Sequence, residues 1–563
     1  MLAATRSQRA RAASNTGEQA LLVLRKSGAM ASPDDARSEA VCRATALADD
    51  TYGLVHTAEG RLTIDAATAQ RLVLAISTEP PPLSDTDDFF SCRARNAAGR
   101  ACGAAKVIMR CAKQGACDSA HVLVTAGFVP AAVGAYQRSV SVALSDETSD
   151  VERIEAFKLA WNAANALEAL ASSVGQRTQG PNDAFQTTRA DVCGEYATLG
   201  VLETASTVLA ASKLRDSPAV AFQLRRTLDL VGITFMGLRD LSVVDASLVR
   251  DIGSYVGDSN GQVASLALNA LHSITVMQDE VTEASKSLTD AALEALCEPH
   301  LVEAIAHAIS RGCVVSGGFI IETLADKAPS HARAFAKPPV VGALLEVISL
   351  DNDDARTAYE KQQKYGNCTR SQSHTGFVAA DGGNVHHRRK IDELGAVALL
   401  AILKTGAVAA SPKLGAAVVV PILDKLRASF VDPTPGPNLY ELRCVCFAIL
   451  ETLAPRHAKE IVKAGGIDVA MDCLKQLKLP GSTAVLRLTE MSAHNPLNFL
   501  HELIITGPAY ADAVRLELKE FTNHPEFSTF DRLCDTWHGT SWRAWFVQQL
   551  ANAPGGPPAW LPA

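Results

Sequence analysis

The sequence predicts an all-α protein whose helices stack into an α-solenoid, one continuous superhelix. The chain has 563 residues, more than one compact core holds, so it contains either several domains or an array of repeats. Ala and Leu dominate the composition and aromatic residues make up 5%, which favours closely packed helices. One short pattern also recurs at intervals of roughly 40 to 70 residues, as expected of a repeat array.

Residues 456–477 contain the clearest copy of this pattern. Ile461 and Val462 are apolar, the Gly465–Gly466 pair interrupts the run, and apolar residues from Ile467 onward recur at helical spacing. A glycine pair at such a point is typical of the end of one helix and the start of another. The pattern therefore predicts a short helix, a tight corner and a second helix of about three turns.

This stretch resembles the first two helices of an armadillo repeat, whose signature is I-V-x-A-G-G-I-x-x-L-x-x-L-L. Repeats of this family are about 40 residues long. The resemblance implies a right-handed superhelix of armadillo-like repeats, in which the third helices line a concave groove. It also implies a non-catalytic protein that uses the groove to bind another protein, without a cofactor.

The same pattern predicts further second and third helices along the chain. Second helices are expected to begin near Phe128, Val201, Ser247, Leu301, Val340, Ala396 and Ile467. Longer apolar stretches that match third helices occupy residues 151–173, 217–236, 261–277, 313–327 and 438–454. Such helices cannot bury their apolar faces alone, so stacking on neighbours is required.

Changes in composition suggest how the chain is organised. We expect a basic N-terminus (1–17), an N-terminal helical cap and loop (18–88), a repeat array (89–495) with a loop insertion (361–390) and a Pro-rich linker (431–438), and a C-terminal cap with a Pro/Trp-rich tail (496–563). The first segment contains Arg6, Arg9 and Arg11 and no acidic residue. Both an organelle transit peptide and a disordered terminus fit that composition.

Charge and cysteine content restrict the class of partner and the compartment. The net charge of −8 comes from interspersed charges of both signs, so no DNA partner is expected. No apolar run reaches the roughly 20 residues that cross a bilayer. The thirteen scattered cysteines fit buried thiols in a reducing compartment. We expect a cytoplasmic protein, or alternatively a nuclear one, or an organellar one if residues 1–17 are a transit peptide.

The best candidate for a binding site is the pair Trp161 and Asn165. The two residues are four positions apart, so they share one face of the predicted helix 151–173. This pair resembles the W-x-x-x-N pair on the third helix of peptide-binding armadillo proteins such as importin α. The resemblance implies that Asn165 binds the backbone of an extended peptide and that Trp161 packs on its side chains. The alternative is a Trp buried between repeats beside an incidental Asn.

Equivalent positions on other predicted third helices provide weaker groove candidates, Asn269, Phe319 and Thr323. An importin-type groove needs the Trp–Asn pair repeated, and here the pair occurs once. A nuclear-transport adaptor that binds basic peptides is therefore an alternative function. A second alternative is an organellar regulatory protein that contacts RNA or an enzyme, suggested by the basic N-terminus and by the His/Arg/Lys run at residues 386–390.

No stretch predicts catalysis or a firm metal site. The sequence contains no phosphate-binding G-x-x-x-x-G-K-[ST] loop and no H-E-x-x-H zinc motif. Its G-x-S-x-G string, Gly257–Gly261, lies between two predicted helices and lacks the preceding strand that a nucleophile elbow requires. Two loose groups of possible metal ligands lack C-x-x-C spacing, so ordinary thiols and surface histidines are favoured. These groups are Cys92, Cys102, Cys111 and Cys117, and Cys368, His374, His386 and His387.

The C-terminal tail contains Trp537, Trp542, Trp545 and Trp560. Their clustering suggests a cap that seals the last repeat, an anchor for a partner, or a tethered ligand, formed by residues 552–563, for the chain's own groove. From the sequence we therefore expect a protein-interaction scaffold, with the partner's identity and the oligomeric state left open.

Overall fold

The computed structural model describes residues 66–78, 97–111, 116–174, 189–212, 218–275, 288–350, 391–430, 437–475 and 483–522. Within these ranges the regular structure is helical throughout, with no β-strand. The all-α fold class is therefore confirmed. The described helices fall into two compact units.

The first unit contains helices from the N-terminal part of the chain. They are α3 (Ala66–Ser77), α5 (Ala97–Cys111), α6 (Ala116–Thr125), α7 (Phe128–Leu144), α8 (Asp150–Val174), α9 (Arg189–Thr198), α10 (Val201–Ser212), α11 (Pro218–Gly237) and α12 (Ala246–Gly253). Helices α13 (Gly261–Thr275) and α14 (Asp290–Leu296) are divided between the two units.

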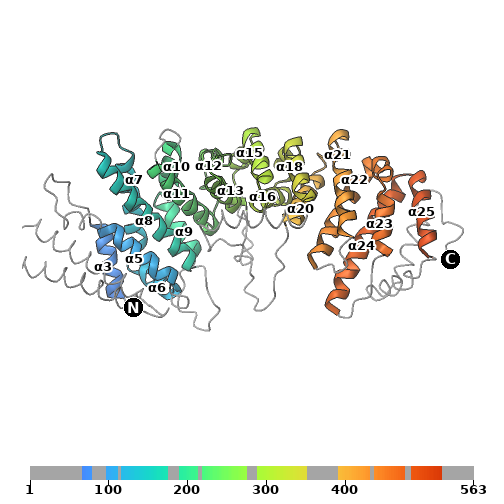
Figure 1. Ribbon diagram of the computed structural model, residues 1–563. Helices are drawn as coiled ribbons and strands as arrows, with labels where there is room; N and C mark the ends of the chain where they lie inside the picture. Colours follow the sequence, from blue (N-terminus) through green and yellow to red (C-terminus); the bar gives the residue numbers. More distant parts are fainter. Residues whose placement is uncertain are drawn as a thin grey trace, which may run out of the picture. The chain divides into compact units, whose positions relative to one another are not determined.

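Two layers of helices form the first unit (Figure 1). In one layer α8 packs between α5 and α11, and in the other α7 contacts α3 and α10, which in turn contacts α12. The two layers meet chiefly where α7 packs along α8. Phe128, Tyr136, Leu167 and Tyr196 are fully buried between the helices. This buried apolar surface is the main source of the unit's stability.

The second unit follows the same plan. Its helices are α15 (Pro299–Ser310), α16 (Val314–Lys327), α17 (Pro329–Ala332), the 3-10 turn η1 (Arg333–Phe335), α18 (Pro338–Ser349), α20 (Ile391–Lys404), α21 (Pro412–Ser429), α22 (Pro437–Lys463), α23 (Gly466–Lys475), α24 (Thr483–Thr506) and α25 (Pro508–Thr522). One layer runs α16, α20, α22, α24 and the other α15, α18, α21, α23, α25, each helix contacting the next (Figure 1).

Tight corners separate several pairs of consecutive helices. Gly127 lies between α6 and α7, Gly200 between α9 and α10, and Gly465 between α22 and α23, with φ of 87°, 83° and 83°. Glycine adopts this left-handed conformation without the steric cost that a Cβ would add. The corner predicted at Gly465–Gly466 is confirmed, and α23 begins at Gly466.

Most predicted helix positions are confirmed. Helices α7, α10, α12, α15, α18 and α23 begin within two residues of the predicted second-helix starts, and α8, α11, α13, α16 and the first part of α22 match the predicted third helices. The prediction of a second helix near Ala396 is wrong. That residue lies in α20, which packs between α16 and α22 in the layer that contains the predicted third helices. Helix α21, which follows Gly406 (φ 77°), lies instead between α18 and α23 in the layer of the predicted second helices.

Helix α22 bends in its C-terminal third. Pro455 lies inside the helix and His457 has non-helical backbone angles, φ −124° and ψ 19°. A proline inside a helix removes one N–H donor and clashes with the preceding turn. The buried His457 ring is fixed there by a 3.1 Å hydrogen bond between its Nε2 and the Ala409 carbonyl oxygen.

Several predictions concern residues outside the described ranges. They are the basic N-terminus at 1–17, most of the proposed cap at 18–88, the insertion at 361–390, most of the linker at 431–438 and the Trp-rich tail after residue 522. The proposed domain boundaries therefore stay predictions.

Candidate functional site

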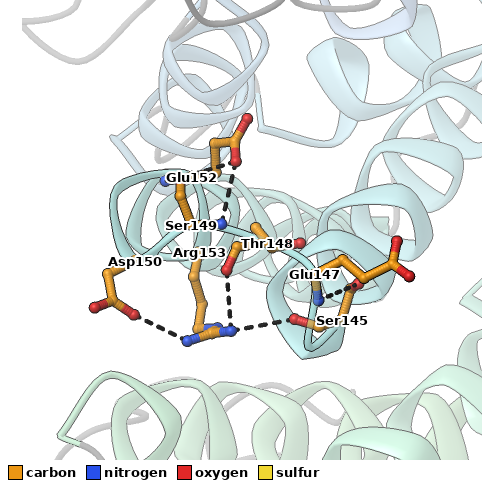
Figure 2. Close-up of polar contacts among 7 residues, drawn as sticks. All are labelled: Ser145, Glu147, Thr148, Ser149, Asp150, Glu152 and Arg153. Carbon is orange, nitrogen blue, oxygen red and sulfur yellow. Dashed lines mark hydrogen bonds and ion pairs between the residues drawn. The ribbon is translucent and has the colours of Figure 1, made fainter.

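The start of α8 is fixed by a dense set of polar contacts (Figure 2). Ser149 and Glu152 form a reciprocal cap: the Ser149 backbone N–H donates to Glu152 Oε2 (3.2 Å) and the Glu152 N–H donates to Ser149 Oγ (3.3 Å). Arg153 donates to the carbonyl oxygens of Ser145 and Thr148 at 3.2 Å and 3.1 Å. The turn between α7 and α8 is thereby tied to α8, which carries Trp161.

Trp161 lies at the centre of the α5–α8–α11 layer, half-buried, with a cation from each neighbouring helix over its ring. The Lys106 ammonium of α5 is 4.9 Å from the ring centroid, and the Arg226 guanidinium carbon of α11 is 5.8 Å from it. Cations at this distance from an aromatic face are attracted by its negative electrostatic potential. The indole therefore links three neighbouring helices.

Asn165 lies one turn further along α8 and is 1% exposed. Its Nδ2 donates to the Trp161 carbonyl oxygen at 2.7 Å, and its Oδ1 accepts from Lys106 Nζ at 3.1 Å. The structure therefore brings Trp161 and Asn165 together as their spacing predicted. It also places the Asn165 amide in contacts within the chain, where it fixes the position of Lys106.

The charges near Trp161 are unequally exposed. Arg226 forms an ion pair with Asp229 at 3.0 Å, in which the arginine side chain is 19% exposed and the aspartate 2%. The Arg226 side chain is therefore the more exposed partner of this pair. Together with the half-buried Lys106, Arg226 gives this surface a positive character.

The weaker candidates lie on other helices. Asn269 is half-buried on α13 and accepts, through its backbone oxygen, a 2.9 Å hydrogen bond from Ser273. Phe319 and Thr323 are half-buried on α16, four positions apart on one face. Asn269 belongs to the first unit and the other two to the second. All three stay predictions as partner-binding residues.

Potential metal ligands do not gather in the described part of the chain, which contains no group of three or more His, Cys, Asp or Glu side chains placed to hold a metal ion. Cys102 is buried in the core of the first unit, and burial raises its thiol pKa to about 12. Cys92 and the second predicted group lie outside the described ranges.

No single described helix is both long and apolar enough to cross a membrane. Two consecutive helical segments, Ser119–Thr125 and Phe128–Leu144, are together long and apolar enough to cross a membrane, but they are bent by 76° relative to each other.

Lys106 and Arg226 were not predicted from the sequence. They are distant from Trp161 along the chain, and helical periodicity gives no information about contacts between repeats. One usable signal was present, since the sequence of α5 contains Arg100, Lys106 and Arg110 and no acidic residue.

Comparison with known proteins adds a likeness of fold. No family model and no curated protein matches the chain. A crystal structure of an engineered protein matches with a TM-score of 0.51 and 14% identity, covering 91% of this chain and 99% of that one.

Two other solved structures match less well. One is from work on a phosphorylation switch that controls the interaction between cadherin and beta-catenin (TM-score 0.32, 13% identity, 83% of this chain and 89% of that one). The other is importin13 in its cytosolic state (TM-score 0.23, 9% identity, 97% and 73%). These two scores are too low to carry an argument, and the first match shows the fold alone.

Proposed function

We propose that the protein is a non-catalytic scaffold that binds another protein on the α5–α8–α11 layer, with Trp161 at the centre of the contact surface. The observation that carries this proposal is the arrangement around Trp161, a half-buried indole fixed between Lys106 and Arg226 on adjacent helices. Trp and Arg are the residues most enriched at the energetic centres of protein interfaces. An anchor that is already ordered loses little conformational entropy on binding.

We further propose that the stacked helices are armadillo-like repeats in a right-handed superhelix. The signature at residues 456–477 supports this, as do the left-handed glycines Gly127 and Gly200, each of which separates a shorter helix from the next one. Gly465, also left-handed, separates the short part of α22 after its kink at His457 from α23. In such an array the layer of third helices, which here includes α5, α8 and α11, forms the binding face. The G-x-S-x-G string at Gly257–Gly261 lies between helices α12 and α13, without the strand that a nucleophile elbow requires, which supports a non-enzymatic role.

Affinity purification from the native cell tests the proposal, with the wild-type chain beside Trp161→Ala. We expect the loss of at least one partner from a variant whose melting temperature shows that it is still folded. Phe319→Ala is the matched control, since Phe319 is also a half-buried aromatic residue but lies on α16 in the other unit. If Trp161→Ala unfolds, Trp161→Phe is used in its place, because phenylalanine keeps an aromatic ring near Lys106 and Arg226.

Two outcomes would overturn this assignment. Identical partners for the wild type and a folded Trp161 variant would remove the α5–α8–α11 layer as the binding surface. Loss of partners from Phe319→Ala alone would place the surface on α16 instead. A partner that passes the test is then titrated, as a purified protein, against both variants.

A further inference from the structure

We propose that the segment bound at the α5–α8–α11 layer is acidic, presenting Asp or Glu side chains to Lys106 and Arg226. This inference rests on the proposed function and deepens it by naming the chemistry of the partner. Three observations support it: the cations that already contact Trp161, the burial of the nearest acidic group, and the charge of the two flanking helices.

The first observation is that the chain supplies its own cations to the indole. Lys106 and Arg226 both lie within 6 Å of the ring centroid, the range in which cation–π attraction operates. A Lys or Arg side chain from a partner would have to displace one of them or approach both. Like charges at contact distance repel strongly when they are partly desolvated. The ring is therefore unfavourable for a basic peptide.

The second observation is the burial of Asp229, the ion-pair partner of Arg226. Among the hydrogen bonds described here Arg226 uses Nη1 toward this carboxylate, while a guanidinium has five N–H donors. With the aspartate 2% exposed, a partner meets the guanidinium and not the carboxylate. A carboxylate arriving from solvent can therefore form a second, charge-assisted contact with Arg226.

The third observation is the charge of the helices on either side of α8. The sequences of α5 and α11 contain five cationic residues and one anionic residue, Asp229, in a chain whose net charge is −8. In α8 the acidic residues occupy the first two turns, apart from Glu168, which is buried. Lys106 and Arg226 thus lie over Trp161 on helices that carry more cationic than anionic residues, in an otherwise acidic protein. Positive charges so placed attract acidic partners.

Asn165 sets a limit on how a bound segment is recognised. Its amide is almost fully buried and holds Trp161 and Lys106, so it does not present hydrogen-bonding groups to a peptide backbone. Recognition in this region then depends on side-chain charge and on contact with the indole. This differs from the backbone recognition that the resemblance implies for Asn165.

Charge-swapped peptides provide the test. Three fluorescein-labelled peptides of equal length, differing only in having Glu, Gln or Lys at alternate positions, are titrated with the full chain and followed by fluorescence anisotropy. We expect the Glu peptide to bind at least about tenfold more tightly than the Gln peptide, and to weaken as salt is raised. Tighter binding of the Lys peptide, or equal binding of all three, would overturn the inference.

Variants connect the result to the site. Lys106→Gln and Arg226→Gln should each weaken binding of the Glu peptide severalfold. Lys475→Gln, which changes the net charge equally but lies on α23 in the second unit, should not. Equal weakening by all three would indicate non-specific attraction and overturn the inference. Melting temperatures identify any variant that has unfolded. If a glutamine variant has unfolded, the charge-conserving variant at the same position, Lys106→Arg or Arg226→Lys, is used in its place and should preserve binding.

The inference and the proposed function can fail separately. In one outcome, a cellular partner is lost from Trp161→Ala but its binding does not change with Lys106→Gln, Arg226→Gln or salt. This result would support the scaffold proposal and contradict the proposal that the bound segment is acidic. In the other outcome, binding of the Glu peptide weakens with salt and requires Lys106 and Arg226, but Trp161→Ala loses no partner in the cell. This result would support the preference for acidic segments and overturn the scaffold proposal.

Discussion

Lys425 and Asp392 form an ion pair of 2.9 Å in the interior of the second unit, with side chains 11% and 2% exposed. The lysine belongs to α21 and the aspartate to the first turn of α20. Lys425 Nζ also donates to the Leu350 carbonyl oxygen at 2.7 Å, just beyond the end of α18. One ammonium therefore fastens three helices of the unit.

The first prediction is that Lys425→Met destabilises the protein by about 3–5 kcal/mol, because it leaves the buried Asp392 carboxylate without its cation. Urea denaturation measures the change. The control is Lys475→Met, whose ion pair with Asp472 is long (3.9 Å) and largely exposed, so its loss should cost less than about 1 kcal/mol. A similar small effect for both would mean that the buried pair contributes little.

The second prediction concerns two glycines that should respond in opposite directions to alanine. Gly465 has a φ of 83°, and an added Cβ would lie 2.9 Å from Arg427 Nη2. Gly465→Ala should therefore cost about 1–2 kcal/mol. Gly342 lies inside α18 with no heavy atom within 4 Å of an added Cβ, so Gly342→Ala should stabilise by about 0.4–1 kcal/mol. Thermal unfolding of both variants tests the difference, and a loss at Gly342 would contradict it.

The third prediction is a loss of stability at alkaline pH. Burial raises the pKa of Cys102, Cys446 and Cys473 from 9.0 to about 12. Between these values the unfolded chain loses protons that the folded chain keeps, so deprotonation favours unfolding. The contribution is complete below pH 9 and decreases toward pH 12, by about 1.4 kcal/mol per pH unit for each thiol.

Urea midpoints at pH 8 and at about pH 10 measure this effect. Cys446→Ala should show a smaller decrease between the two pH values than the wild type, even if the variant is less stable at both. A midpoint that stays constant or rises with pH would contradict the prediction, because the folded state would then no longer hold the extra protons.

The fourth prediction concerns the cap at the start of α8. Ser149→Ala removes the hydroxyl that accepts from the Glu152 N–H and should cost about 1 kcal/mol, as the loss of an N-terminal cap usually does. Ser141→Ala is the matched control, an exposed serine inside α7, and should change stability little. Calorimetry distinguishes the two, and equal effects would mean that the cap contributes nothing.

The positions of most helices followed from apolar periodicity and glycine corners, and the one wrong assignment shows the limit of this reasoning. The Leu394–Gly395 pair resembles the corner at Leu199–Gly200. However, Gly395 lies within α20, where an added Cβ would approach Val347 and Ile348 of α18 to 3.2 and 3.3 Å. Gly395 therefore allows α20 to pack closely against α18. A sequence alone does not distinguish that role from a left-handed corner, because both require the missing side chain.

For the candidate site, the sequence predicted what lies on one helix and missed what comes from its neighbours. The four-residue spacing placed Trp161 and Asn165 on one face, which the 2.7 Å hydrogen bond from Asn165 Nδ2 to the Trp161 carbonyl confirms. Lys106 is 59 residues from Asn165, and such contacts depend on how two repeats stack. The Asn165 amide contacts the Trp161 carbonyl and Lys106 of the chain itself, and its expected role in peptide binding stays a prediction.

The anchorage by Lys425 also has a consequence for how this protein can change over evolution. Leu350 and Asp392 come immediately before and shortly after residues 351–390, and Lys425 contacts both. Lys425 thus holds the end of α18 and the start of α20 against α21. We therefore expect related chains to vary in length at this point, and a fluorescent reporter inserted there to leave the second unit folded.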